Sequence, residues 1–321
     1  MDIQKLDREG LSALFNKLIE AGEKSFNQSD DVLVALFGGF KKKKLYVYSA
    51  DSNGGKTLWL VDQLVNCGIK HKKICWYHSV EEPTEDIYRL LLSNYLQIDR
   101  NKIITGDLEE EEKQKIIDFT VNQDFGNILI TFGQLPDWSV VEKILQTNKV
   151  DCFFFDYLAT FANPDGASDA DYLIARQMSQ KLHELAVSAN CAIITATQLN
   201  ANSRDRKKQS AEIFRNSSYL QGSASVQNAA DVAMIVSSQQ YFNASENEIF
   251  ANLKMPEQAD SRSLRIVIDI YKNRCGMKNR KVFAFLDTFK CKMYPIAVFK
   301  ERTDGVFPLE EIPNALILDQ N

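Results

Sequence analysis

A short run of small residues between an apolar stretch and a helical pattern has the composition of a phosphate-binding loop. It ends in Gly-Lys-Thr, the ending of the Walker A pattern, and Ala50 stands where that pattern places its first glycine. Glycine lets successive backbone N–H groups curl around phosphate oxygens, and a lysine adds a positive charge. We therefore predict that ATP is bound by Asp51, Ser52, Asn53, Gly54, Gly55, Lys56 and Thr57.

Two oxygen-bearing side chains are placed to bind the Mg²⁺ that accompanies ATP. Thr57 begins the helical pattern after the loop, where its hydroxyl can reach a metal beside the positive helix terminus. Asp156 ends the apolar run 152–155, as a Walker B strand ends beside a phosphate loop. An aspartate at a strand end can also serve only the following turn. Because a phosphate loop precedes it, we predict that Asp156 binds the metal together with Thr57.

Three further side chains are candidates for the hydrolytic step. Glu81 and Glu82 follow the apolar stretch 74–78, and a carboxylate there can polarise the water that attacks the γ-phosphate. The alternative for either glutamate is an ordinary acidic residue at the start of a helix. Gln198 follows the apolar stretch 192–195, and we predict that it hydrogen-bonds the γ-phosphate.

Two groups of cations lie far from the loop in sequence. Lys272 and Arg274 close a strand pattern and precede Gly276. Such cations can act as fingers on a neighbouring subunit's γ-phosphate, or they can belong to an ordinary exposed turn. The polar stretch 202–215 suits contact with a nucleic-acid backbone, although a merely solvated loop has the same composition. Its candidate DNA-binding residues are Arg204, Arg206 and Lys207.

Apolar strand patterns alternate with helical patterns through the first two thirds of the chain. We predict strands at 45–50, 74–78, 128–131, 152–155 and 192–195, and helices at 58–67, 84–95 and 108–120. This alternation indicates parallel βαβ units in a sheet covered on both faces. From Val232 onward, polar turns link strand patterns at 232–236, 264–271 and 281–286, which we expect to be antiparallel additions at one edge. The predicted fold class is α/β, with a mostly parallel central sheet flanked by helices and antiparallel edge strands.

Composition and domain boundaries narrow the class of protein. A chain of 321 residues with 45% hydrophobic content can bury a large core. We find no apolar run that could span a membrane, no signal peptide and no Cys-x-x-Cys pair, so we expect a cytoplasmic protein. We divide it into an amphipathic helix at 1–30, an ATPase domain at 31–299 and a tail at 300–321. That helix could pack on its own domain or dock on a neighbouring subunit.

With these motifs in order, the chain resembles the motor domain of DnaB-type replicative helicases, which are hexameric RecA-like ATPases. The resemblance rests on Gly38-Gly39-Phe40, Ser79-Val80-Glu81, Asp156-Tyr157-Leu158, Gln198-Leu199-Asn200 and Lys272-Asn273-Arg274. It implies a RecA-like core, ATP hydrolysis with Mg²⁺ between subunits of a ring, and a role in DNA replication. It also favours Glu81 over Glu82 as the catalytic glutamate and places Lys272 and Arg274 against a neighbour's nucleotide.

The resemblance also implies partners. The segment Leu220-Gln221-Gly222-Ser223-Ala224 is similar to the family's pore loop, so Gln221, Gly222 and Ser223 become candidate contacts to single-stranded DNA. The family usually has a basic residue where Gln221 stands, and this departure bears on DNA affinity. Replicative members also carry an N-terminal helical domain; roughly 37 residues precede Gly38, so we do not expect that domain here. Primase and a loader remain possible partners.

Two other functions fit the same residues. The first is a DNA-binding ATPase that does not unwind DNA, and the second is a ring-subunit mimic that docks on another helicase. The presence of Lys56, Glu81 and Asp156 argues against the mimic.

Overall fold

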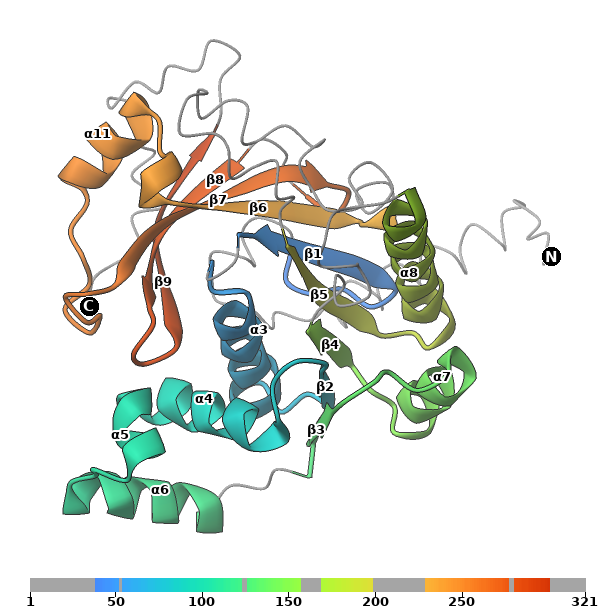
Figure 1. Cartoon of the computed structure of the whole chain (residues 1–321), viewed down its shortest axis with the longest axis horizontal. Helices are drawn as coiled ribbons and strands as arrows, with labels where there is room; N and C mark the ends of the chain where they lie inside the picture. The colour runs from blue at the N-terminus through green and yellow to red at the C-terminus, as the bar shows by residue number, and fades with distance from the viewer. Residues whose placement is uncertain are drawn as a thin grey trace, which may run out of the picture.

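One nine-stranded sheet runs through the part of the chain that the structure, a computed structural model, describes. The described residues are 38–51, 54–122, 126–156, 169–198, 229–276 and 280–300. Along the sheet the strands follow the order β3-β2-β4-β5-β1-β6-β7-β8-β9 (Figure 1). Their bounds are Lys44–Ala50 (β1), Cys75–Ser79 (β2), Ile128–Phe132 (β3), Cys152–Asp156 (β4), Ala192–Gln198 (β5), Val232–Ser238 (β6), Leu264–Asn273 (β7), Arg280–Asp287 (β8) and Lys292–Lys300 (β9).

The sheet is parallel over its first six positions and antiparallel beyond them. Neighbouring strands from β3 to β6 run parallel, whereas β7, β8 and β9 each run antiparallel to the strand before them. The prediction of antiparallel additions was therefore wrong for β6, which pairs parallel with β1. A long connection from β5 lets β6 return in the same direction, and the apolar pattern of a buried strand does not reveal direction.

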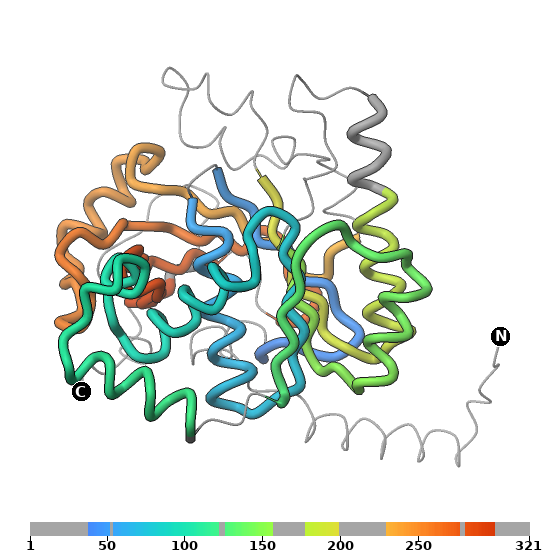
Figure 2. Tube along the Cα trace, turned by 60° about the horizontal axis from the view of Figure 1, so that its bottom comes forward, coloured from blue at the N-terminus to red at the C-terminus, as the bar shows by residue number. Residues whose placement is uncertain are grey.

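Helices cover both faces of the sheet. Figure 2 shows α3 and α8 on opposite sides of the strands. The helices are α3 (Lys56–Leu64), α4 (Thr84–Leu96), α5 (Arg100–Thr105), α6 (Glu110–Asn122), α7 (Trp138–Thr147), α8 (Asp169–Ser188) and α11 (Ala244–Asn252), with a π-helix η1 at Val65–Lys70 and a 3-10 turn η4 at Gln239–Tyr241. The predicted helices at 58–67, 84–95 and 108–120 correspond to α3 with η1, α4 and α6.

The strand β1 shows how alternation divides the core into two layers. Tyr46 and Tyr48 face the layer that contains α3 and α4, whereas Leu45 and Val47 face the layer that contains α7 and α8. All four side chains are buried. Because successive side chains of a strand point to opposite faces, a continuously apolar strand packs against helices on both sides.

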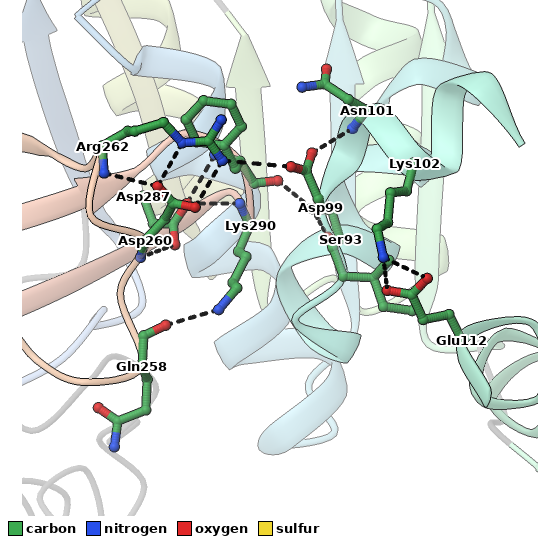
Figure 3. A network of polar contacts seen from close by, with 12 residues as sticks. Ser93, Asp99, Asn101, Lys102, Glu112, Gln258, Asp260, Arg262, Asp287 and Lys290 are labelled. Carbon is green, nitrogen blue, oxygen red and sulfur yellow. Dashed lines mark hydrogen bonds and ion pairs between the residues drawn. The ribbon is translucent and has the colours of Figure 1, made fainter. Parts of the chain in front are cut away.

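The turn between β8 and β9 is bound to the junction of α4 and α5 (Figure 3). The backbone N–H of Arg100 donates to the carbonyl of Phe289 at 2.8 Å, and the Ser93 hydroxyl lies 3.0 Å from the same oxygen. The guanidinium of Arg262 lies 3.4 Å from the centre of the Phe289 ring and pairs with Asp260 at 2.8 Å. These contacts join the antiparallel end of the sheet to the helices of the parallel part.

The predicted domain boundaries stay predictions. The N-terminal segment 1–30 and residues 301–321 of the tail lie outside the described residues. The last described strand, β9, continues to Lys300. None of the helices in the described ranges is long and apolar enough to span a membrane.

Candidate nucleotide site

The predicted phosphate loop lies at the carboxyl end of β1 and leads into α3. Gly55 precedes the first helical residue, Lys56, and has a φ of 77°, a left-handed conformation that favours glycine. A Cβ atom at Gly55 would lie 2.3 Å from a methyl carbon of Leu286. The backbone N–H of Gly54 donates to the Asp51 carbonyl at 2.9 Å. Ser52 and Asn53 lie outside the described residues, so their predicted phosphate contacts stay predictions.

Lys56 points back over this loop. Its ammonium group donates to the carbonyl oxygen of Asp51 at 2.9 Å. This contact holds the positive charge near the N-terminus of α3, where backbone N–H groups have no partner within the helix. The end of β1 therefore presents a cation and helix N–H groups together, a combination that binds anions.

The carboxylate of Asp156 lies beside the start of α3 and is buried, with 4% of the residue exposed. Its Oδ2 accepts a hydrogen bond of 2.7 Å from the Tyr77 hydroxyl, whereas Oδ1 is buried without a hydrogen-bond partner. Burial raises the pKa of Asp156; the hydroxyls of Tyr77 and Thr57 and the charge of Lys56 oppose that rise. A buried carboxylate oxygen without a partner is costly unless a ligand completes it, so this donor set fits a hard cation such as Mg²⁺.

Both candidate glutamates lie at the end of the neighbouring strand β2. The Val80 N–H donates to the carbonyl of Asp156 at 2.9 Å, which ties this strand end to β4. Glu81 is exposed, whereas Glu82 is half-buried. Burial, and after it the charge of Asp156, raises the pKa of Glu82. The structure thus brings both carboxylates to the site edge, and the choice of Glu81 stays a prediction.

Gln198 is placed directly beside the phosphate loop. It is the last residue of β5 and pairs in register with Ala50, the last residue of β1. Next to the loop on its other side, a small open hollow adjoins the ends of β6, β7 and β8. The hollow is lined by Asp51, Gly54, Val236, Ser238, Leu264, Ile266 and Leu286.

Lys272 and Arg274 lie at the end of β7, two strands away from β1. Asn273 between them pairs with Val232 at the start of β6, and the Arg274 N–H donates to the Asp231 carbonyl at 2.9 Å. Through Ala233, Lys272 is level with Val47, which lies three residues before the end of β1, or about 10 Å along the strand at roughly 3.3 Å per residue. Both cations therefore lie short of the carboxyl end of β1.

The surroundings of these cations change the pKa of Lys272. Lys272 is half-buried and Arg274 is exposed. Burial, and after it the charge of Arg274, lowers the pKa of Lys272 to about 8, while Asp231 opposes the shift. The Asp231 carboxylate is buried and binds Lys44 at 3.1 Å and the Leu45 N–H at 3.1 Å, so it anchors the end of β7 to the start of β1.

Sequence reasoning missed Tyr77 and His78. Both lie in β2, where an apolar aromatic pattern suggested only core residues. His78 is buried, with its ring nitrogens 2.8 Å from the Thr131 hydroxyl and 3.1 Å from the Gly133 carbonyl. No sequence signal pairs a strand tyrosine with an aspartate 79 positions away, because the pairing depends on the register of β2 against β4. The predicted DNA contacts Arg204, Arg206, Lys207, Gln221, Gly222 and Ser223 lie outside the described residues.

The sheet order and this site define a RecA-like α/β ATPase fold, and comparison with solved structures agrees. The chain matches one solved ATPase domain with a TM-score of 0.69 and 18% identity, covering 91% of this chain and 99% of that one. It matches a DnaB-like replicative helicase, solved to show its interactions with primase, with a TM-score of 0.64 and 17% identity, covering 91% of this chain and 67% of that one. The two TM-scores show a shared fold.

Comparison of sequences identifies the family. The model of the DnaB-like helicase C terminal domain matches residues 27–291, so the chain belongs to this family. The SPbeta prophage-derived uncharacterized protein YorI of Bacillus subtilis is 26% identical over 255 residues, which cover 71% of this chain and 50% of that protein. A probable replicative DNA helicase of Trieres chinensis is 24% identical over 232 residues, covering 70% and 50%. The chain spans about half the length of these relatives.

Proposed function

We propose that this chain is the ATP-hydrolysing motor of a DnaB-type helicase, which uses ATP to move along single-stranded DNA during replication. The observation that carries the proposal is the gathering of Lys56, Asp156 and Gln198 at one edge of a parallel sheet. Ligands of open α/β sheets bind outside the carboxyl ends of the strands, which is the edge where these residues lie.

Each residue of this edge has a chemical task. Residues 51–57 and the N-terminus of α3 bind the phosphates. Asp156 and Thr57 would hold Mg²⁺, which neutralises phosphate charge when it is bound. Gln198 hydrogen-bonds the γ-phosphate. Glu81 accepts a proton from the attacking water, with the half-buried Glu82 as its rival.

The two cations at the other edge complete a neighbouring site. Lys272 and Arg274 lie two strands away from β1 and short of its carboxyl end, and the family resemblance directs them at another subunit's nucleotide, where they would stabilise transition-state charge. We therefore propose a ring, hexameric as in the family, with ATP bound between subunits. Catalysis then depends on assembly.

The proposed DNA contacts come from the sequence. Arg204, Arg206 and Lys207, together with Gln221, Gly222 and Ser223, are proposed to line the path of single-stranded DNA. Primase and a loader are proposed partners, and one structural neighbour is a DnaB-like replicative helicase for which interactions with primase are described.

The test is ATP turnover by the full chain with and without single-stranded DNA, run beside sizing with nucleotide and a strand-separation assay. We expect DNA-stimulated turnover, a nucleotide-dependent ring and unwinding. DNA affinity should be largely independent of sequence and fall steeply with salt, with a smaller slope for Arg206→Ala. Stimulated turnover without strand separation would reduce the function to a DNA-dependent ATPase. Absence of both turnover and DNA binding would overturn the proposal.

A further inference from the structure

The hydroxyl of Tyr77, on the strand next to β4, contacts the carboxylate of Asp156, which we propose binds the metal. Tyr77 lies on β2 and is fully buried, and its hydroxyl donates to Oδ2 of Asp156 at 2.7 Å. Two residues further on, Ser79 pairs in register with Asp156, and the Val80 N–H donates to the Asp156 carbonyl. Both the backbone and the side chain of Asp156 are therefore held by β2.

This contact makes the two carboxylate oxygens unequal. Oδ2 is engaged by a short hydrogen bond to a buried hydroxyl, whereas Oδ1 is buried and has no hydrogen-bond partner. A carboxylate whose one oxygen is fixed cannot rotate freely, so the other oxygen keeps one direction. The strand that ends at Asp156 packs against α3, whose second residue is Thr57 with the predicted metal-binding hydroxyl. Partners of this kind fix the orientation of metal ligands.

A simpler explanation is that any buried tyrosine hydroxyl takes the nearest acceptor. Tyr48 on β1 provides the comparison. It is also fully buried, on the same layer of the core as Tyr77, yet its hydroxyl has no hydrogen-bond partner. The core of this protein thus tolerates an unpaired tyrosine hydroxyl, and the pairing at Tyr77 needs its own reason.

We propose that Tyr77 is a positioning residue for the metal site: its hydroxyl holds Oδ2 of Asp156 so that Oδ1 is directed at the Mg²⁺ of the bound nucleotide. This inference rests on the proposed function, because it requires that Asp156 binds the metal. It adds to the proposed site a residue that lies neither in the phosphate loop nor on the strand of Asp156.

The test compares Tyr77→Phe with Tyr48→Phe in the full chain. Each substitution removes one buried hydroxyl and leaves the ring, and thermal melting checks that both variants fold. Binding of a fluorescent ATP analogue is measured while Mg²⁺ is titrated, and again in excess chelator. We expect Tyr77→Phe to need about 10-fold or more Mg²⁺ for half-saturation, with unchanged binding in chelator. Tyr48→Phe should match the wild type in both.

Two further readouts separate positioning from general structural damage. Saturating Mg²⁺ should restore the turnover of Tyr77→Phe to near the wild-type rate. In an Asp156→Asn background, Tyr77→Phe should have no further effect on the Mg²⁺ dependence, because the carboxylate that Tyr77 positions is gone.

Failure of this inference can be told from failure of the proposed function. If the wild type shows Mg²⁺-dependent binding and Tyr77→Phe behaves like Tyr48→Phe, Tyr77 is only a core residue. Additive effects in the Asp156→Asn background, or turnover that Mg²⁺ does not restore, would equally overturn the positioning role. If the wild type itself binds no nucleotide, the proposed function is wrong.

Discussion

The carboxyl edge and the amino edge of the parallel sheet carry charged groups with different surroundings. At the carboxyl edge, Lys56 lies over the loop, and Asp156 and Gln198 lie at the ends of neighbouring strands, around one small region. At the amino edge, Lys272 and Arg274 have no such surroundings among the described residues. They are anchored through Asp231 to the start of β1.

Under the proposed function, one chain holds two unlike parts of a catalytic site. At the carboxyl edge, the proposed nucleotide contacts come from strand ends that meet. Within the described part of the chain, the amino edge offers cations without a phosphate site of their own. In the proposed ring, the cations of one chain would complete the nucleotide site of the next chain.

The largest effects are expected at the carboxyl edge. Lys56→Ala should abolish nucleotide binding, because it removes the charge that faces the phosphates. Glu81→Gln should keep binding and lose hydrolysis by orders of magnitude, since a general base serves only the transition state. Equilibrium binding and single-turnover hydrolysis measure the two separately.

Glu82→Gln is the matched control for Glu81→Gln. The two residues are adjacent, and both substitutions remove one negative charge. If Glu82→Gln loses hydrolysis while Glu81→Gln retains it, the half-buried glutamate is the base and the assignment from family resemblance is wrong.

The next effect tests whether the amino edge acts on another chain. Arg274→Ala should lower turnover by about 10³ while leaving nucleotide binding largely intact. Mixing it with Lys56→Ala should restore activity above either variant alone, because some interfaces then combine an intact loop with an intact finger. The readout is the ATPase rate of the mixture. Two variants that stay inactive together would place Arg274 in its own subunit's site or in none.

A smaller effect follows from the pKa of Lys272, which burial and Arg274 lower to about 8. Lys272 is charged below that pH and neutral above it. If its charge is needed, turnover at saturating ATP should fall as pH rises through about 8, approaching tenfold per pH unit. Lys272→Arg should flatten this fall because arginine stays protonated. Superimposable pH profiles of the two proteins would show that the charge of Lys272 is not used.

The smallest effect concerns stability at the carboxyl edge. Burial lowers the pKa of His78, and its hydrogen bond to the Gly133 carbonyl opposes that shift. The unfolded chain therefore takes up a proton at His78 before the folded chain does, so this residue makes stability fall as pH drops through about 6.5. His78→Phe should lose less stability between pH 7.5 and 5.5, measured by urea unfolding. Equal losses would mean that His78 does not titrate differently in the two states.

Much of the carboxyl edge could be predicted from local patterns. The loop at 51–57, the strand that ends at Asp156 and the position of Gln198 each depend on a few consecutive residues. A Gly-Lys-Thr run between a strand and a helix specifies its own backbone, and the alternation of strands and helices makes the strand ends meet. These features lie close to where they were expected.

Tertiary structure decided three features: the direction of β6, the positions of Lys272 and Arg274 relative to the loop, and the contact between Tyr77 and Asp156. Each depends on how distant segments are paired: β6 against β1, β7 against β6, and β2 against β4. Apolar strand patterns carry no information on direction or register, because a strand buried on both faces looks the same in either orientation. The chain's own sequence thus determined which groups can bind phosphate, and only the folded sheet decided which of them can act on the same nucleotide.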